Sequence, residues 1–183
     1  MQSEKMIQSL VEHTRQFINR AEELKNYELS TLTWKENATS WSILECLEHL
    51  NLYGDFYLRE IETKIKQSKT QHEAIIKSGF LGAYFAKSML PKEKLNKMKT
   101  FKDKNPLNAQ LDKGVIDKFI RQQIQLLNLL DLSKKVSLNK VKIQTSISSL
   151  IRLKLGDTFL FFVNHIVRHL QQIDRIEAAM KKV

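Results

Sequence analysis

Glycine and proline, the residues that most often interrupt helices, are scarce in this chain: 5 Gly and 2 Pro among 183 residues. The stretches between them repeat apolar side chains three and four positions apart, which is the spacing of a helix with one buried face. They predict long helices at about residues 3–26, 42–68, 111–132 and 157–181. The less regular residues 69–110 would join the second helix to the third. The sequence therefore predicts an all-α fold, a four-helix bundle with one long crossover region, as a single domain over residues 1–183.

The ends and faces of these helices can also be predicted from single residues. Ser42 and Glu45 match the S-x-x-E capping box, in which each side chain bonds the other residue's backbone N–H. Asp157 is the expected N-cap of the last helix. The third helix is expected to bury Val115, Phe119, Ile124, Leu127 and Leu130.

Two segments between the long helices carry weaker patterns. The apolar stretch 79–90, which stops at Pro91, predicts a short helix packed over one end of the bundle. A pocket lid, an oligomer surface and plain core are all open interpretations of that stretch. Residues 133–155 are expected to form a connector with a short strand or helical turn at "TSISSLIRL".

Composition excludes several classes of protein. Apolar residues make up 42% and charged residues 27%, which is typical of a globular chain. No run of about eighteen apolar residues is present, so no membrane partner is expected. The N-terminal residues lack the apolar core of a signal peptide. Cys46, the single cysteine, cannot form an internal disulfide, and we expect a cytoplasmic location.

The chain is basic, with 30 Lys+Arg against 20 Asp+Glu and a formal net charge of +10. Much of the excess lies in residues 91–106 and 133–142, where lysines predominate and Phe101 is the single aromatic residue, too few for a series of stacked bases. Lysine is the weaker sign of planar phosphate or base recognition. A solvated basic surface is therefore favoured, and nucleic-acid binding is kept as the less favoured alternative.

Two histidines stand in the apolar seam of the last helix, in the stretch "FFVNHIVRHLQQIDRI". His165 and His169 are one turn apart on the same face, a spacing that lets two imidazoles bind one transition metal. His49, near the core face of the second helix, is the best third ligand. Hydrogen bonding within the core is the alternative for all three. "HIVRH" lacks the Glu of H-E-x-x-H, which argues against a zincin-type peptidase.

Other candidate residues have simpler explanations. His13 lies beside a better-filled apolar stripe, and His72 lies in a polar segment, so both are expected to be solvated. Cys46 is interpreted as a small buried thiol. Tyr53 and Tyr57 are interpreted as core aromatics, although either hydroxyl could face the site.

"WSILECLEHL" and "LKLGDTFLFFVNHIVRHLQQI", with "MKTFKDKNP" between them, resemble the paired signatures of the DinB/YfiT-like family of metal-binding four-helix bundles. The likeness covers most of the chain. It implies that His49, His165 and His169 bind a divalent metal ion. Their second nitrogens would then need partners, for which Gln172 and Glu45 are candidates, although the capping box alone explains Glu45.

The resemblance also implies a function. Similar proteins include thiol S-transferases that use low-molecular-weight thiols such as bacillithiol, mycothiol-dependent isomerases and metal-dependent hydrolases. We therefore expect a metal-dependent S-transferase or hydrolase acting on a small molecule. The alternative from another class is a non-catalytic metal-binding stress-response protein. Zinc or nickel is the favoured metal, iron and manganese remain open, and a homodimer is expected by analogy.

Overall fold

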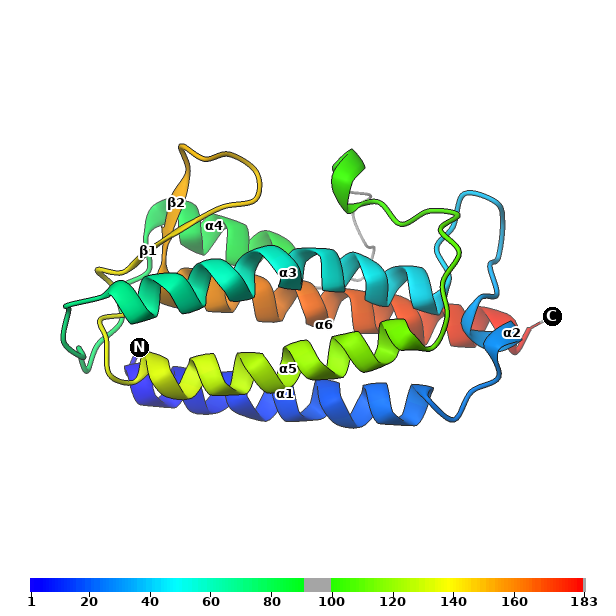
Figure 1. Cartoon of the computed structure of the whole chain (residues 1–183), viewed down its shortest axis with the longest axis horizontal. Helices are drawn as coiled ribbons and strands as arrows, with labels where there is room; N and C mark the ends of the chain where they lie inside the picture. The colour runs from blue at the N-terminus through cyan, green and yellow to red at the C-terminus, as the bar shows by residue number, and fades with distance from the viewer. Residues whose placement is uncertain (91–99, 183) are drawn as a thin grey trace.

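The computed structural model describes residues 1–90 and 100–182 (Figure 1). Within them the long helices are α1 (Ser3–Leu24), α3 (Ile43–Gln67), α5 (Gly114–Ser133) and α6 (Leu155–Met180). The shorter elements are α2 (Leu29–Leu32), α4 (Phe80–Met89), the 3-10 helix η1 (Lys102–Lys104), β1 (Lys142–Gln144) and β2 (Arg152–Lys154). The mostly helical structure confirms the prediction of an all-α fold.

The four long helices pack in a ring, in which α1 and α3 each contact both α5 and α6. Figure 1 shows α3 and α5 running in the same direction, as a crossover between these two helices requires. One cluster of apolar side chains fills the space between the helices. Its largest fully buried members include Tyr57, Phe119, Phe159 and Phe162. Burial of this surface is the main force that holds the helices together.

The start of α3 is as the sequence predicts, whereas the start of α6 is not. Ser42 accepts a hydrogen bond from the Glu45 backbone N–H, and the Glu45 carboxylate accepts one from the Ser42 N–H. Asp157, in contrast, does not cap its own helix, because β2 runs directly into α6 and Lys154 takes the N-cap position. The carboxylate of Asp157 accepts instead from the Gly79 N–H at 2.8 Å, and so holds the start of α4.

Helix α4 lies along α6 rather than over one end of the bundle. Close approach depends on Gly82: a Cβ atom there would lie 2.4 Å from Cβ of Asp157. The side chains of Phe80, Leu81 and Tyr84 on α4 are exposed. The 79–90 prediction of a short helix is therefore right, and its expected position is wrong.

The buried stripe of α5 differs from the predicted one. Ile124 is 49% exposed and Leu127 is only half-buried, whereas Leu126 and Leu129 are buried instead. Two glutamines, Gln122 and Gln123, also take buried positions on this helix. A prediction from apolar spacing treats every glutamine as exposed. Because α5 buries two of them, the prediction misplaced the buried face of this helix.

The connector before α6 contains an antiparallel pair of strands, in which Ile143 lies opposite Leu153. A short strand was expected at residues 145–153, but only the last two residues of that stretch belong to β2, and the rest connects the two strands. None of the helices within residues 1–90 and 100–182 is long and apolar enough to cross a membrane.

Candidate metal centre

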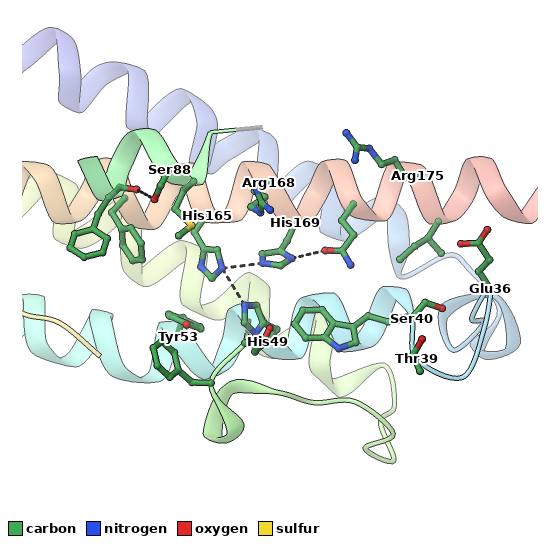
Figure 2. Close-up of a pocket in the computed structure, with 18 of the residues that line it drawn as sticks. Glu36, Thr39, Ser40, His49, Tyr53, Ser88, His165, Arg168, His169 and Arg175 are labelled. Carbon is green, nitrogen blue, oxygen red and sulfur yellow. Dashed lines mark hydrogen bonds between the residues drawn. The ribbon is translucent and has the colours of Figure 1, made fainter. Parts of the chain in front are cut away.

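The three histidines of the sequence analysis come together where α3 faces α6 (Figure 2). Nε2 of His165 lies 3.2 Å from Nε2 of His49 and 3.0 Å from Nε2 of His169. Three nitrogens bound to a tetrahedral zinc ion at about 2.0–2.1 Å lie roughly 3.3 Å apart. The three side chains are buried, at 3%, 4% and 7% exposure for His49, His165 and His169. This spacing fits one transition-metal ion.

Two of the imidazoles are oriented by a hydrogen bond at their other nitrogen. Nδ1 of His49 donates to the Lys104 carbonyl at 2.6 Å, and Nδ1 of His169 donates to Oε1 of Gln172 at 3.0 Å. Carbonyl oxygens only accept, so both histidines carry their proton on Nδ1 and leave the Nε2 lone pair free. Such contacts orient the metal-binding nitrogen in metalloproteins.

His165 has no such anchor within the described residues. Its Nδ1 is buried without a hydrogen-bond partner, and its Nε2 lies between the two lone pairs of His49 and His169. A single N–H on Nε2 can satisfy one of those lone pairs, so at least one electron-rich contact stays uncompensated. A shared cation would compensate all three nitrogens at once. The donor set therefore fits a divalent ion on the structure's own geometry.

The surroundings keep the cluster in the form that binds metals. Burial is the main cause that lowers the pKa of His49 to about 4; the bond to the Lys104 carbonyl opposes the shift, and the nearby charge of Lys104 adds to it. Burial also puts the pKa values of His165 and His169 well below the ordinary value. All three imidazoles are neutral at pH 7, as metal ligation requires.

Aromatic side chains form the wall around the cluster. The ring centroid of Trp41 lies 4.7 Å from that of His49 and 5.8 Å from that of His169. The ring of Tyr53 lies 4.7 Å from that of His165. Burial raises the pKa of Tyr53 to about 12, so its phenol stays protonated at neutral pH. These rings shield the imidazoles while the phenol offers a hydrogen-bond donor.

A cavity of about 770 Å³ opens beside the histidines. Helix α4 contributes Phe85, Ser88 and Met89 to its wall, so the 79–90 segment is part of the pocket lining. Helix α6 adds Arg168, which lies between its two histidines, and Arg175, which lies beyond them. The volume is that of a typical small-molecule site.

Of the two residues proposed to bond the second nitrogens of the histidines, the structure places one against a histidine and the other elsewhere. Gln172 lies against His169 as expected. Glu45 directs one carboxylate oxygen to the Lys35 ammonium and the Asn108 N–H, both at 2.6 Å, and the other to the capping box. It makes no hydrogen bond to a histidine within the described residues. The capping interpretation of Glu45 is therefore sufficient.

The remaining candidates lie away from the three nitrogens or line the cavity. Cys46 is fully buried, and burial raises the pKa of its thiol. His72 is exposed, whereas His13 is half-buried and bonds to the Ser9 carbonyl. The hydroxyl of Tyr57 is within hydrogen-bond distance of the Ser146 hydroxyl and accepts from its N–H, so Tyr57 is a bonded core aromatic.

Sequence reasoning missed three features of this site. The Lys104 carbonyl is a backbone atom from the crossover region and leaves no sequence signal. The position of Trp41 beside the imidazoles was also not foreseen. The two arginines had a readable signal, since Phe161, His165, Arg168, Gln172, Arg175 and Ala179 follow one another at alternating steps of four and three residues.

Fold and site together define a helical bundle with a buried three-histidine group beside a small-molecule cavity. The family model of the DinB superfamily matches residues 9–173, and the chain belongs to this superfamily. No curated protein and no solved structure matches the chain. Membership agrees with the sequence resemblance, and the three-histidine group is one that could hold a metal ion.

Proposed function

We propose that this protein is a divalent-metal-dependent enzyme that acts on a small molecule, by thiol transfer in first place or by hydrolysis. One observation carries the proposal: three neutral Nε2 atoms converge at the wall of a cavity of about 770 Å³. A structural metal site is closed by protein ligands, whereas a catalytic one keeps a position for substrate. Three protein ligands facing a cavity favour the catalytic kind.

The chemistry follows from the neutral ligand set. A divalent ion held by His49, His165 and His169 would retain its full positive charge and lower the pKa of a thiol or water beside it. Gln172 and the Lys104 carbonyl orient two of the ligands. Zinc and nickel are the favoured ions, and imidazole also accepts iron.

The cavity wall supplies the remaining functions. Trp41 limits water at the imidazoles, which strengthens electrostatic interactions at that wall. The protonated phenol of Tyr53 can donate a hydrogen bond to a substrate oxygen or sulfur. A homodimer and a low-molecular-weight thiol as co-substrate complete the proposal.

Metal analysis of untagged protein tests the proposal first. We expect about one divalent ion per chain in the wild type and none in the His165→Ala, His169→Ala double variant. A His13→Ala, His72→Ala double variant removes the same number of imidazoles outside the cluster and should keep the metal. Failure of the wild type to take up zinc or nickel would leave the proposal without a chemical basis.

Turnover assays then separate catalysis from simple binding. The loaded protein is assayed for conjugation of cysteine to an electrophile such as chlorodinitrobenzene, and for hydrolysis of p-nitrophenyl acetate. Activity that disappears in the metal-free His49→Ala variant supports an enzyme and shows which reaction it favours. A bound metal with no activity in either assay would favour the non-catalytic metal-binding protein.

A further inference from the structure

Two stretches of the chain, residues 74–90 and 132–156, contain no acidic residue. Their cations are Lys77, Lys87, Lys134, Lys135, Lys140, Lys142, Arg152 and Lys154. The formal net charge of the whole chain is +10, so these eight cations leave the rest of the chain close to neutral. Most of the basic excess therefore lies in these two stretches.

The structure brings the two stretches together. Helix α4 packs against β2, and Figure 1 shows it beside the β1–β2 hairpin. The ammonium of Lys154 donates a hydrogen bond to the Lys77 carbonyl, which ties the end of the hairpin to the residues before α4. The exposed side chains of residues 77–90 and 142–154 therefore form one surface, the α4–hairpin face.

Large apolar side chains are exposed on the α4–hairpin face. Phe80 and Leu150 are each 91% exposed, and Leu81, Tyr84 and Ile147 are also exposed. Tyr84 and Ile147 line the same cavity, so the loop of the hairpin lies near α4. Apolar side chains gathered in this way on a surface mark a site that a partner covers.

The charge of this face is positive. Four exposed cations of the face form no ion pair within residues 1–90 and 100–182: Lys77, Lys87, Lys142 and Arg152. The carboxylates of Asp157 and Glu60 accept from backbone N–H groups of the face, and these side chains are buried and half-buried, respectively. A partner of the face must therefore carry negative charge and also accept apolar side chains.

An anionic lipid bilayer meets both conditions. Its headgroups attract Lys and Arg, and Phe and Leu side chains enter the boundary between headgroups and acyl chains. A second copy of the chain does not meet them, because a symmetric dimer through this face would set like charges against each other. A nucleic-acid duplex would pair with the cations through its phosphates but would leave the exposed leucine side chains in water.

We propose that the α4–hairpin face binds the surface of an anionic lipid bilayer. Binding of this kind is peripheral and needs no helix that crosses the membrane, so it revises the expectation of no membrane partner. Because Tyr84 and Ile147 also line the cavity, binding turns the rim of the cavity toward the lipid. The inference does not depend on the metal centre.

Sedimentation with sucrose-loaded vesicles tests the proposal. Vesicles of phosphatidylglycerol and phosphatidylcholine in equal parts are compared with vesicles of phosphatidylcholine alone, at about 0.1 M NaCl, where exposed charges act over about 10 Å. We expect the wild type to bind the anionic vesicles at least ~10-fold more tightly. Most of this binding should be lost at about 1 M NaCl, where the charges are screened within about 3 Å.

A pair of double variants tests the apolar side chains at constant charge. Phe80→Ser with Leu150→Ser should lower the affinity for anionic vesicles by ~10-fold or more, because the apolar contact with the lipid is lost. Leu29→Ser with Ile124→Ser removes two exposed apolar side chains of α2 and α5, and should bind as the wild type does.

A second pair of variants tests the cations at constant net charge. Lys87→Gln with Arg152→Gln should lower the affinity by roughly 10- to 30-fold, because each removes a cation close to the headgroups. Arg15→Gln with Arg121→Gln removes two exposed cations of α1 and α5 instead. It should change the affinity by less than about threefold, since charges farther than about 10 Å from the lipid are screened.

A fluorescent label reports which surface meets the lipid. Cys46 is fully buried, so a cysteine introduced by Leu150→Cys can be labelled alone with an environment-sensitive dye such as NBD. Its emission should shift to the blue when anionic vesicles are added. The same label on the Ile124→Cys variant should not change.

The same measurements show what would overturn the inference. No binding to anionic vesicles, or binding that survives unchanged in the Phe80, Leu150 variant, would refute it. A DNA duplex bound as tightly as the vesicles, with a loss in the Lys87, Arg152 variant and none in the Phe80, Leu150 variant, would assign the face to nucleic acid instead. A wild-type dimer that becomes monomeric in the Phe80, Leu150 variant would assign the face to a second copy of the chain.

Discussion

Helices α1 and α6 lie side by side in the same bundle, yet they bury different kinds of residue. The buried side chains of α1 are apolar apart from Ser3 and Thr14, whose hydroxyls donate to the carbonyls of Glu73 and Leu10. Helix α6 buries His165, Arg168 and His169 among its phenylalanines. The polar groups of α1 are satisfied inside the protein, whereas one histidine of α6 is not. We infer that α1 mainly stabilises the fold, whereas α6 keeps buried polar groups that lower stability but could form a binding site.

The largest effect is expected on the α1 side. Phe17 is almost completely buried, and Phe17→Ala should lower the free energy of unfolding of the metal-free protein by about 3–5 kcal/mol. Urea denaturation measures the change. Metal content per folded chain should stay at the wild-type value, with Phe17→Leu as the milder control. A loss of metal from the folded variant would show that α1 also shapes the site.

Acid should lower the stability of the metal-free protein through the histidines between α3 and α6. The folded-state pKa of His49 is about 4, below its ordinary value of about 6.5, so the unfolded chain binds more protons between these pH values. Stability of the metal-free protein is therefore full above about pH 6.5 and falls as the pH drops toward 4. His49 alone accounts for on the order of 3 kcal/mol.

Unfolding measured across this pH range checks the sign and the source. His165 and His169 shift in the same direction and add to the slope. The His49→Leu variant should show a shallower dependence, whereas the exposed His72→Leu control should follow the wild type. A stability that rises on acidification would contradict the assignment of neutral imidazoles.

The sequence predicted both helices of this comparison, and it also predicted that the three histidines lie close together. Apolar periodicity defines each helix, and the i, i+4 spacing puts His165 and His169 on one face. The capping box fixes where α3 begins, and the apolar residues spaced around His49 place it on the core face. The pairing of α3 with α6 follows from the family resemblance rather than from either helix alone.

What the sequence could not show depends on backbone atoms and on distant partners. The Lys104 carbonyl reaches His49 from a segment 55 residues away, and any residue type would provide the same oxygen. Asp157 was expected to cap its own helix because N-cap preferences are local, but a neighbouring backbone N–H competed for the carboxylate. The cavity itself lies between α3, α4, α6 and the segments that connect the helices, and no pattern within one helix encodes its volume.

A smaller effect is expected where α6 supports its own ligand. Gln172→Leu removes the acceptor of the His169 Nδ1–H, and metal affinity should fall by roughly 10- to 100-fold. Competition with a chromophoric chelator measures the affinity. Gln171→Leu changes the exposed neighbouring amide and should leave affinity unchanged. Equal affinities in the two variants would remove Gln172 from the site.

The smallest predicted change is in the free energy of unfolding when an apolar side chain replaces a buried histidine of α6, so that α6 resembles α1. His165→Leu replaces a buried imidazole, whose Nδ1 has no partner among the described residues, by an apolar side chain of similar size. An unsatisfied buried polar group is unfavourable, so the metal-free variant should unfold with a free energy about 1 kcal/mol higher than the wild type. The same variant should bind no metal, since two imidazoles remain.

The sign of that change is the informative quantity, and urea denaturation of both metal-free proteins measures it. His165→Ala controls for packing, because it removes the same imidazole but leaves a cavity, and should unfold more easily than His165→Leu. Stabilisation by leucine, together with loss of metal, would show that the histidine is held in the core for binding. If leucine destabilises the metal-free chain as much as alanine does, the imidazole itself stabilises the fold. The inference that the buried histidine of α6 lowers stability would then be wrong.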